Sequence, residues 1–235
     1  MIAARLLIAS ICLVGNGISF ASQQSTDANL ALPPKEKSPA RVFVSREVLA
    51  KMIVSKQPVE YPPEAVAKNA EGPVIVSIVI DQDGTVSYSK ELAGYAVLGP
   101  AAVAAVREWK FRPAVYQGKR VEVTSDVVVE VPSPNRSASS ALLQVDVDTA
   151  EAHVLRPSKI DYPSGAATAR IQGYVIVKCE IGTDGKVLKA KAISGHPWLT
   201  TAAEVAVSKQ LYTPFTKDGT PVEAETYVIE LFKLP

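Results

Sequence analysis

The sequence predicts an α+β protein made of two tandem small domains, each a three-stranded antiparallel sheet with two helices. The first observation is an internal repeat: a shift of 101 residues, from Tyr61 to Tyr162, aligns residues 61–131 with residues 162–232 without a gap. The second is that both units carry alternating apolar residues, which favour strands, next to apolar residues at helical spacing. The period is too long for a solenoid repeat and matches a small domain.

The two units agree most closely where the backbone geometry is demanding. The shared residues are turn-forming pairs and single glycines and prolines: Tyr61-Pro62 with Tyr162-Pro163, Gly72 with Gly173, Asp83-Gly84 with Asp184-Gly185, Gly94 with Gly195, Pro113 with Pro214, and Gly118 with Gly219. Glycine supplies positive φ angles and proline fixes φ, so these residues report a shared backbone. We interpret the chain as a tandem duplication.

The N-terminus is expected to be a cleavable export signal, residues 1–21. Arg5 is followed by an apolar run, residues 6–14, and then by the small-x-small sequence Ser19-Phe20-Ala21. The apolar run is short of the roughly 20 residues needed to cross a bilayer. The expected location is therefore the periplasm, and the alternative is an uncleaved inner-membrane anchor.

Composition divides the rest of the chain. Residues 22–40 are polar and proline-containing and are expected to be a disordered lead-in. The first domain is assigned to residues 41–132, the linker to residues 133–142 and the second, diverged domain to residues 143–235.

The elements of the first unit follow from its periodicity. A short helical turn begins at Ser45, and Pro62-Pro63 suits the first turn of the next helix. The expected elements are a helical turn over 45–52, a helix from 62 to about 70, a hairpin of 73–80 and 85–92, a helix over 100–109, and a final strand over 121–131.

Two departures of the second unit from the first are informative. Gln210 stands where the first unit has Trp109, and Glu230 occupies an inward position of the last strand. The opposite face of that strand is apolar, with Tyr227, Ile229 and Leu231. This pattern indicates either a local bulge that exchanges the two faces, or a face packed against the first domain or another chain.

Charge and motif content exclude several functions. The chain has 25 Lys and Arg against 24 Asp and Glu without a basic cluster, which argues against nucleic-acid binding. Its two histidines lie in no ligand-spaced cluster and no phosphate-binding glycine loop is present, so we expect no metal, no cofactor and no catalytic residues. Cys12 leaves with the signal, and Cys179 is expected to be a buried, unpaired thiol on a strand.

An ordered set of motifs resembles the C-terminal domain of the TonB energy transducers of Gram-negative bacteria. The motifs are Gln57-Pro58, Tyr61-Pro62-Pro63-Glu64-Ala65, Glu71-Gly72-Pro73-Val74, Asp83-Gly84-Thr85-Val86 and residues 106–113, with residues 194–199 and 218–223 in the second unit. The resemblance implies a non-enzymatic periplasmic protein linked to transport, with the sheet and helices described above. The expected partner is an outer-membrane receptor, or another protein with an extended segment.

The resemblance also implies a binding site. In the family, the edge of the final strand accepts a receptor peptide as an added strand, which satisfies unpaired backbone groups. The expected edge residues are Val121, Glu122, Val123, Thr124, Ser125, Asp126 and Val127 in the first unit, and Val222, Glu223, Ala224 and Glu225 in the second. Gln57 matches the family's contact region before the first helix.

Two features keep an alternative open. Full transducers have a membrane anchor and a long proline-rich spacer, whereas this chain has only the short lead-in of residues 22–40. Exposed sheet edges also allow a structural or self-associating protein, so a homodimer is the alternative to a receptor partner.

Overall fold

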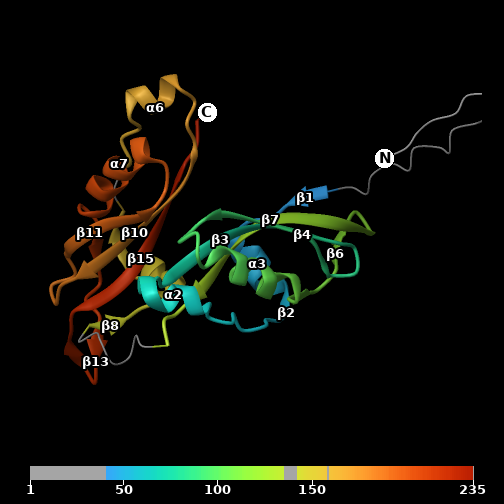
Figure 1. Ribbon diagram of the computed structural model, residues 1–235, viewed down its shortest axis with the longest axis horizontal. Coiled ribbons are helices and arrows are strands. Elements are labelled where there is room, and N and C mark those ends of the chain that lie inside the picture. Colours follow the sequence, from blue (N-terminus) through green and yellow to red (C-terminus); the bar gives the residue numbers. More distant parts are fainter. Residues whose placement is uncertain (1–40, 135–141, 158, 235) are drawn as a thin grey trace, which may run out of the picture. The chain divides into compact units, whose positions relative to one another are not determined.

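The computed structural model describes residues 41–134, 142–157 and 159–234 (Figure 1). The predicted signal peptide, the predicted lead-in and most of the predicted linker lie outside these residues. Both repeats belong to one compact unit that begins at Pro39.

The first repeat contains the elements that its periodicity predicts. They are α1 (Arg46–Met52), α2 (Pro63–Lys68), β3 (Gly72–Ile80), β4 (Val86–Ala93), α3 (Gly99–Arg107) and β7 (Lys119–Val131). The structure adds four short strands, which are β1 (Arg41–Phe43), β2 (Ile53–Ser55), β5 (Lys110–Phe111) and β6 (Ala114–Tyr116).

The three long strands form the predicted antiparallel sheet. β3 is central, with β4 on one side and β7 on the other. One face packs against α3, where Ala102 and Val106 are fully buried with alternate residues of β3 and β7. Hydrophobic side chains at helical spacing on α3 therefore meet side chains at strand spacing on the sheet, as the sequence indicates.

The second repeat has the same order of elements. They are β8 (Leu143–Gln144), α5 (Val147–Ala152), β9 (Val154–Arg156), α6 (Ser164–Thr168), β10 (Gly173–Ile181), β11 (Val187–Ser194), α7 (Pro197–Val207), β12 (Leu211–Tyr212), β13 (Thr216–Lys217), β14 (Thr220–Pro221) and β15 (Ala224–Phe232). Its sheet follows the order β11-β10-β15-β8. Cys179 on β10 is unpaired and 1% exposed, as predicted.

The repeated Asp-Gly pairs are hairpin turns in both repeats. Gly84 has φ +88 and Gly185 has φ +79, a region that favours glycine. A Cβ atom at either position would overlap a backbone carbonyl, that of Phe111 or of Tyr212. Close approach of the backbone therefore adds to the demand for glycine at these turns.

The apolar outer face of β15 packs against the first repeat. Ile176 and Tyr227 of the second repeat are buried together with Ile75 of the first, and Ile229 packs against this cluster. The register between β10 and β15 runs without a shift from the pair Gly173–Phe232 to the pair Ile181–Ala224. The outer face is therefore an interface between the repeats, and the alternative of a face-exchanging bulge in β15 is wrong.

Polar contacts also join the two repeats. They are the hydrogen bond from Tyr174 to Asp126 (2.7 Å), that from the Gly94 amide to Ser194 Oγ (2.9 Å), that from the Val147 amide to Glu130 (2.8 Å), and the ion pairs Arg46–Glu151 (2.9 Å) and Lys178–Glu71 (3.2 Å). Hydrogen-bond geometry constrains how the two outer faces can pack.

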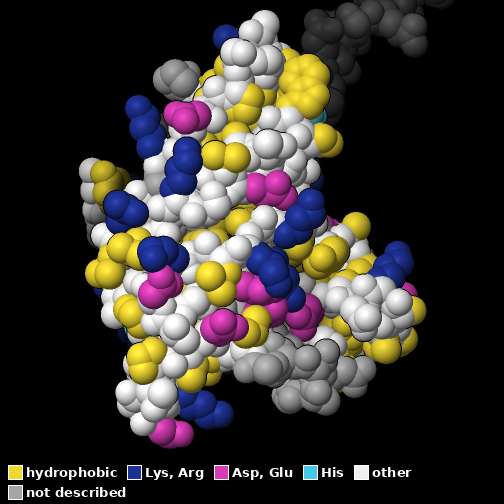
Figure 2. Space-filling view, turned by 90° about the vertical axis from the view of Figure 1, so that its left-hand side faces the viewer, with side chains coloured by type: hydrophobic (Ala, Val, Ile, Leu, Met, Phe, Trp, Pro, Cys, Tyr) yellow, Lys and Arg dark blue, Asp and Glu magenta, His cyan; other side chains and the backbone are white. Residues whose placement is uncertain are grey.

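The surface carries charges of both signs. Figure 2 shows Lys and Arg side chains interspersed with Asp and Glu on the face in view, without a large patch of one sign. Across the described residues, no helix has the length and apolar character needed to cross a membrane.

Candidate functional site

The outer edge of β7 is covered at its beginning by the chain itself. β6 pairs with Lys119–Val121, and β1 runs parallel to β7 with Phe43 opposite Thr124. The Val44 amide donates to the Thr124 carbonyl at 3.1 Å, and the Ser125 hydroxyl donates to the Val44 carbonyl at 2.9 Å. Four predicted edge residues are thus already in paired stretches: Val121, Glu122, Val123 and Thr124.

The remaining predicted residues of β7 start an open stretch. Beyond Thr124, no described strand pairs with this edge. Because the Thr124 carbonyl points toward β1 and backbone groups alternate along a strand, Asp126 and Val128 also direct their N–H and C=O groups outward. Ser125 and Val127 direct theirs toward β3. The structure therefore offers Asp126 and Val128 for strand addition.

The second repeat repeats this arrangement. β8 runs parallel to β15, with Leu143 opposite Ala224 and Gln144 opposite Glu225. The amides of Leu143 and Val145 donate to the carbonyls of Glu223 (2.9 Å) and Glu225 (3.0 Å).

Each residue predicted for the second edge is thus engaged within the chain. The Val222 amide donates to the Phe215 carbonyl at 2.9 Å, and Val222 precedes β15. Glu223, Ala224 and Glu225 lie beside β8. The open stretch lies further along, where Ile229 and Leu231 direct backbone groups outward by the same alternation.

Gln57 lies beside the open part of β7. Its carbonyl accepts a 3.2 Å hydrogen bond from the indole N–H of Trp109. Gln57, Trp109, Val128 and Glu130 are among the residues that line a cavity of about 470 Å³. The structure therefore brings the predicted contact residue Gln57 next to the predicted edge strand.

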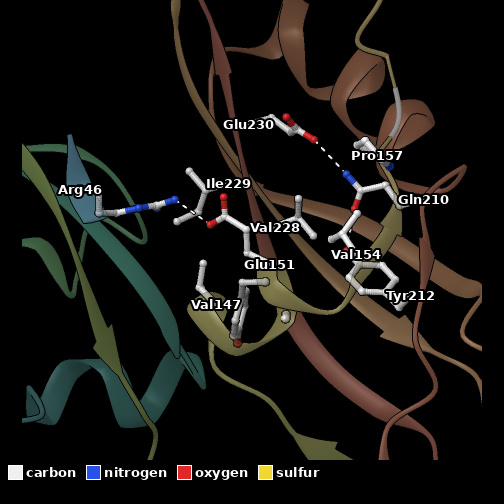
Figure 3. A pocket seen from close by; sticks show the side chains of 12 residues that line it. Arg46, Val147, Glu151, Val154, Pro157, Gln210, Tyr212, Val228, Ile229 and Glu230 are labelled. Carbon is white, nitrogen blue, oxygen red and sulfur yellow. Dashed lines mark hydrogen bonds and ion pairs between the residues drawn. The ribbon is translucent and has the colours of Figure 1, made fainter. Parts of the chain in front are cut away.

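The corresponding position of the second repeat holds a cavity with different chemistry. This cavity, of about 400 Å³, lies between α5, β9 and β15 and is drawn in Figure 3. Its lining includes Gln210 and Glu230. The equivalent residues of the first repeat are Trp109 and Val129. We call it the Glu230 cavity; Arg46, Val147, Ala150, Glu151, Val154, Pro157, Tyr212, Tyr227, Val228 and Ile229 complete its lining.

Three polar side chains in the Glu230 cavity form a chain of hydrogen bonds. The Tyr212 hydroxyl donates to Gln210 Oε1 at 2.6 Å, and Gln210 Nε2 donates to Glu230 Oε1 at 3.3 Å. Tyr212 is 1% exposed and Gln210 is 8% exposed. Because Tyr212 fixes the amide oxygen of Gln210, the amide nitrogen points at the carboxylate of Glu230.

Burial perturbs the titration of these groups. Loss of solvent, and after it the nearby charge of Glu151, raise the pKa of Glu230 to about 6. Burial also raises the pKa of Tyr212 above its ordinary value. Tyr212 therefore stays neutral at physiological pH and remains a hydrogen-bond donor.

The sequence identified Gln210 and Glu230 as departures but did not place them in a site. Both positions lie on the inward side of their elements, where the first repeat is apolar. Two polar replacements at inward positions that face each other are the signal that could have predicted a polar cavity.

Metal binding finds no support in the part of the chain that the structure describes. No group of three or more His, Cys, Asp and Glu side chains lies close enough there to hold a metal ion. The edges of β7 and β15 can form backbone hydrogen bonds with a ligand. The Glu230 cavity presents a carboxylate.

The comparison with protein families matches both repeats. The family model described as Gram-negative bacterial TonB protein C-terminal matches residues 57–130 and, a second time, residues 158–234. No curated protein sequence matches this chain significantly. Each match covers the long strands of one repeat and its two later helices, α2 and α3 in the first repeat and α6 and α7 in the second.

Proposed function

Because this chain belongs to the Gram-negative bacterial TonB protein C-terminal family, we propose that it acts in the periplasm by binding extended peptide segments as an added strand. The proposed role is linked to TonB-dependent transport across the outer membrane. The partner is an outer-membrane receptor, since domains of this family interact with such receptors.

The edge pairing of β7 and β15 carries the proposal. Both strands accept a short parallel strand from their own chain, β1 on β7 and β8 on β15. Both then continue with a stretch to which no described strand is paired. An edge that already accepts one strand and continues with outward backbone donors and acceptors suits the addition of another.

A peptide scan tests the proposal. Overlapping synthetic peptides covering the periplasm-facing segments of receptors from the same bacterium are titrated against the full chain. Peptides that bind are then remade with single N-methylated residues. Strand addition predicts that methylation weakens binding at alternate residues only, because only every second amide faces the edge. Absence of binding by every peptide, or equal loss at adjacent residues, would overturn the proposal.

A second candidate is self-association through the same edges. The observation that favours it is that, among the described strands, both β7 and β15 have a stretch of edge to which no strand is paired. Measuring the mass in solution distinguishes this candidate. It is supported if the protein is a dimer at micromolar concentration and if proline substitution in β7 or β15 dissociates that dimer. A monomer at all concentrations eliminates it.

A further inference from the structure

The Glu230 cavity opens beside the edge of β15, and we propose that it selects a lysine or arginine side chain from the extended segment that binds there. This inference rests on the proposed strand addition and names the class of segment that the second repeat accepts. The first repeat, with Val129 at the equivalent position, lacks this selectivity.

The first argument is the polar replacement inside one chain. In the first repeat, Trp109 is 4% exposed and Val129 is 3% exposed, and both belong to the apolar core. In the second repeat, Gln210 and Glu230 stand at these positions and line the cavity. Burying a carboxylate is unfavourable unless it is paired, so the replacement needs a compensating partner.

The second argument is that the described residues supply no cation in an ion pair with Glu230. Among the described residues, its carboxylate accepts a hydrogen bond from Gln210, and no Lys or Arg lies within ion-pair distance. Arg46, which lines the same cavity, pairs with Glu151 at 2.9 Å, as Figure 3 shows. The charge of Glu151 is thereby balanced, and that of Glu230 is not.

The third argument is the shape and lining of the cavity. A volume of about 400 Å³ falls within the range of ligand pockets. Val154, Pro157 and Val228 give it apolar walls. A long aliphatic stem that ends in a cation matches apolar walls with one carboxylate, because lysine and arginine bury their stems and keep the charged end on a polar group.

The fourth argument is register. Glu230 lies between Ile229 and Leu231, whose backbone groups face the open edge, while its own side chain points to the cavity. On an added strand that runs antiparallel to β15, a residue placed opposite Glu230 has its Cβ about 4.5–5.5 Å away on the same face. Opposite charges at such a cross-strand position stabilise the pairing, and the residue opposite Glu230 belongs to a non-hydrogen-bonded pair, in which side chains lie closest.

The raised pKa of Glu230 also supports a lysine or arginine side chain as the partner. The pKa of Glu230 is raised to about 6 by burial and then by Glu151, with Arg46, Tyr212 and Tyr227 as the other titratable groups that line the cavity. A bound cation favours the ionised carboxylate and lowers this pKa.

The test uses the tightest-binding peptide of the receptor scan described above. Each position is replaced in turn by lysine, arginine, norleucine or glutamate, and the affinity for the full chain is measured at neutral pH. We expect one position at which lysine or arginine binds about tenfold more tightly than norleucine, since hydrogen bonds to charged groups contribute more than neutral ones. Glutamate at that position is expected to bind most weakly.

Two variants locate the selectivity. Glu230→Gln is expected to equalise the affinities for the lysine and norleucine peptides. Asp218→Asn removes an exposed carboxylate from the same repeat, at the β13–β14 turn, and is expected to retain the tenfold preference. An equal loss of preference in both variants would overturn the inference in favour of a nonspecific charge effect.

A spectroscopic measurement gives an independent readout. The carboxyl resonance of Glu230, followed by carbon NMR against pH, is expected to show a lower pKa with the lysine peptide than with the norleucine peptide. Peptides that bind without any preference for a basic residue, or that leave this pKa unchanged, overturn the inference but not strand addition. A receptor scan without any binding peptide overturns strand addition itself.

Discussion

The phenol of Tyr174 donates a 2.7 Å hydrogen bond to the carboxylate of Asp126 and so attaches the second repeat to the open edge strand of the first. Burial of the phenol raises the pKa of Tyr174. The Asp126 carboxylate, which accepts a hydrogen bond from the phenol, raises this pKa further. The phenol is therefore neutral over the physiological range and keeps its donor role. Asp126 thus has two functions in β7: its backbone faces the open edge, and its side chain holds the repeat interface.

The Tyr174–Asp126 contact is expected to stabilise the packing of the repeats. Tyr174→Phe removes the donor and should lower the free energy of unfolding by about 1 kcal/mol. In a double-mutant cycle with Asp126→Ala, the two effects should not add, because each substitution removes the same hydrogen bond. Urea denaturation of the four proteins measures this; fully additive effects would contradict a direct contact.

The backbone of Asp126 is expected to matter more for peptide binding than its side chain. Asp126→Pro removes an outward N–H group and places a proline ring in the path of an added strand, on an edge that can accommodate proline. We expect this variant to stay folded and to bind peptide at the β7 edge more weakly, by about 0.5–1.5 kcal/mol of binding free energy or more.

The matched control is Asp126→Ala, which loses the same side-chain contact to Tyr174 but keeps the N–H group. It is expected to bind peptide nearly as wild type does, as measured by calorimetric titration. Equal affinity for both variants would remove β7 as the binding strand.

Displacement of β1 is expected to lengthen the open edge of β7. Val44→Pro deletes the amide that donates to the Thr124 carbonyl at 3.1 Å. Hydrogen exchange at the Thr124 amide should accelerate, and peptide affinity at this edge should rise, because the peptide no longer competes with β1.

Phe43→Pro is the control for this experiment. Phe43 lies opposite Thr124 and is 70% exposed, and its backbone groups point away from β7 by alternation. This variant should therefore retain β1 pairing. Unchanged exchange at Thr124 in the Val44→Pro variant would show that β1 does not protect the edge.

Glu230 is expected to make stability fall as pH rises. Its pKa is raised to about 6 in the folded state, so the folded protein binds this proton more tightly than the unfolded chain does. The folded state is therefore penalised progressively above about pH 4.5, and fully above about pH 6. Glu230→Gln lacks the charge and should be more stable than wild type by roughly 1 kcal/mol at about pH 8, after allowance for partial solvent screening.

Below about pH 4.5 the two proteins should be equally stable, because Glu230 is then protonated in both states. Urea denaturation at several pH values checks this. A stability difference that does not depend on pH would assign the effect to packing and not to the carboxylate.

The export signal gives a prediction outside the described residues. The pattern of Arg5, the apolar run 6–14 and Ser19-Phe20-Ala21 predicts a mature N-terminus at Ser22. Mass spectrometry of the periplasmic fraction should find a chain that begins at Ser22. An intact Met1 in the membrane fraction would instead support the anchored alternative.

Local patterns in the sequence predicted the larger elements well. The helices α1 and α3, the hairpin of β3 and β4, and the strand β7 follow from apolar periodicity and from turn glycines such as Gly84, which act within a few residues. The short strands β1 and β8 could not be predicted, because two or three residues carry no period and their pairing with β7 and β15 is made by residues distant in sequence.

The candidate edge residues were predicted near the beginnings of β7 and β15, where the structure shows short strands of the same chain already paired. Sequence alternation identifies a strand and its faces, but not what covers its edge. The coverage of residues up to Thr124 and Glu225 depends on β1 and β8, and so became visible only in the structure. The apolar face with Tyr227 and Ile229 was recognised, and its burial against the first repeat settles which alternative holds.

The interface between the repeats has an approximate twofold character. Ile75 and Ile176 are equivalent positions of the two repeats, and both lie in the shared cluster; Val128 and Ile229 are another such pair. Tyr227, the equivalent of Asp126, lies against Gly72, where a Cβ atom would come within 2.9 Å of its ring. Gly72 directly precedes Pro73, the equivalent of Tyr174, so Tyr227 packs one residue away from the position that exact symmetry would give it.

Equivalent residues that contact each other reciprocally are the mark of an isologous dimer interface. The tandem chain therefore has the organisation of an ancestral homodimer whose two subunits became covalently joined. Fusion places both subunits in one gene product but lets each sequence change separately. That freedom explains how one half can carry Trp109 and Val129 while the other carries Gln210 and Glu230.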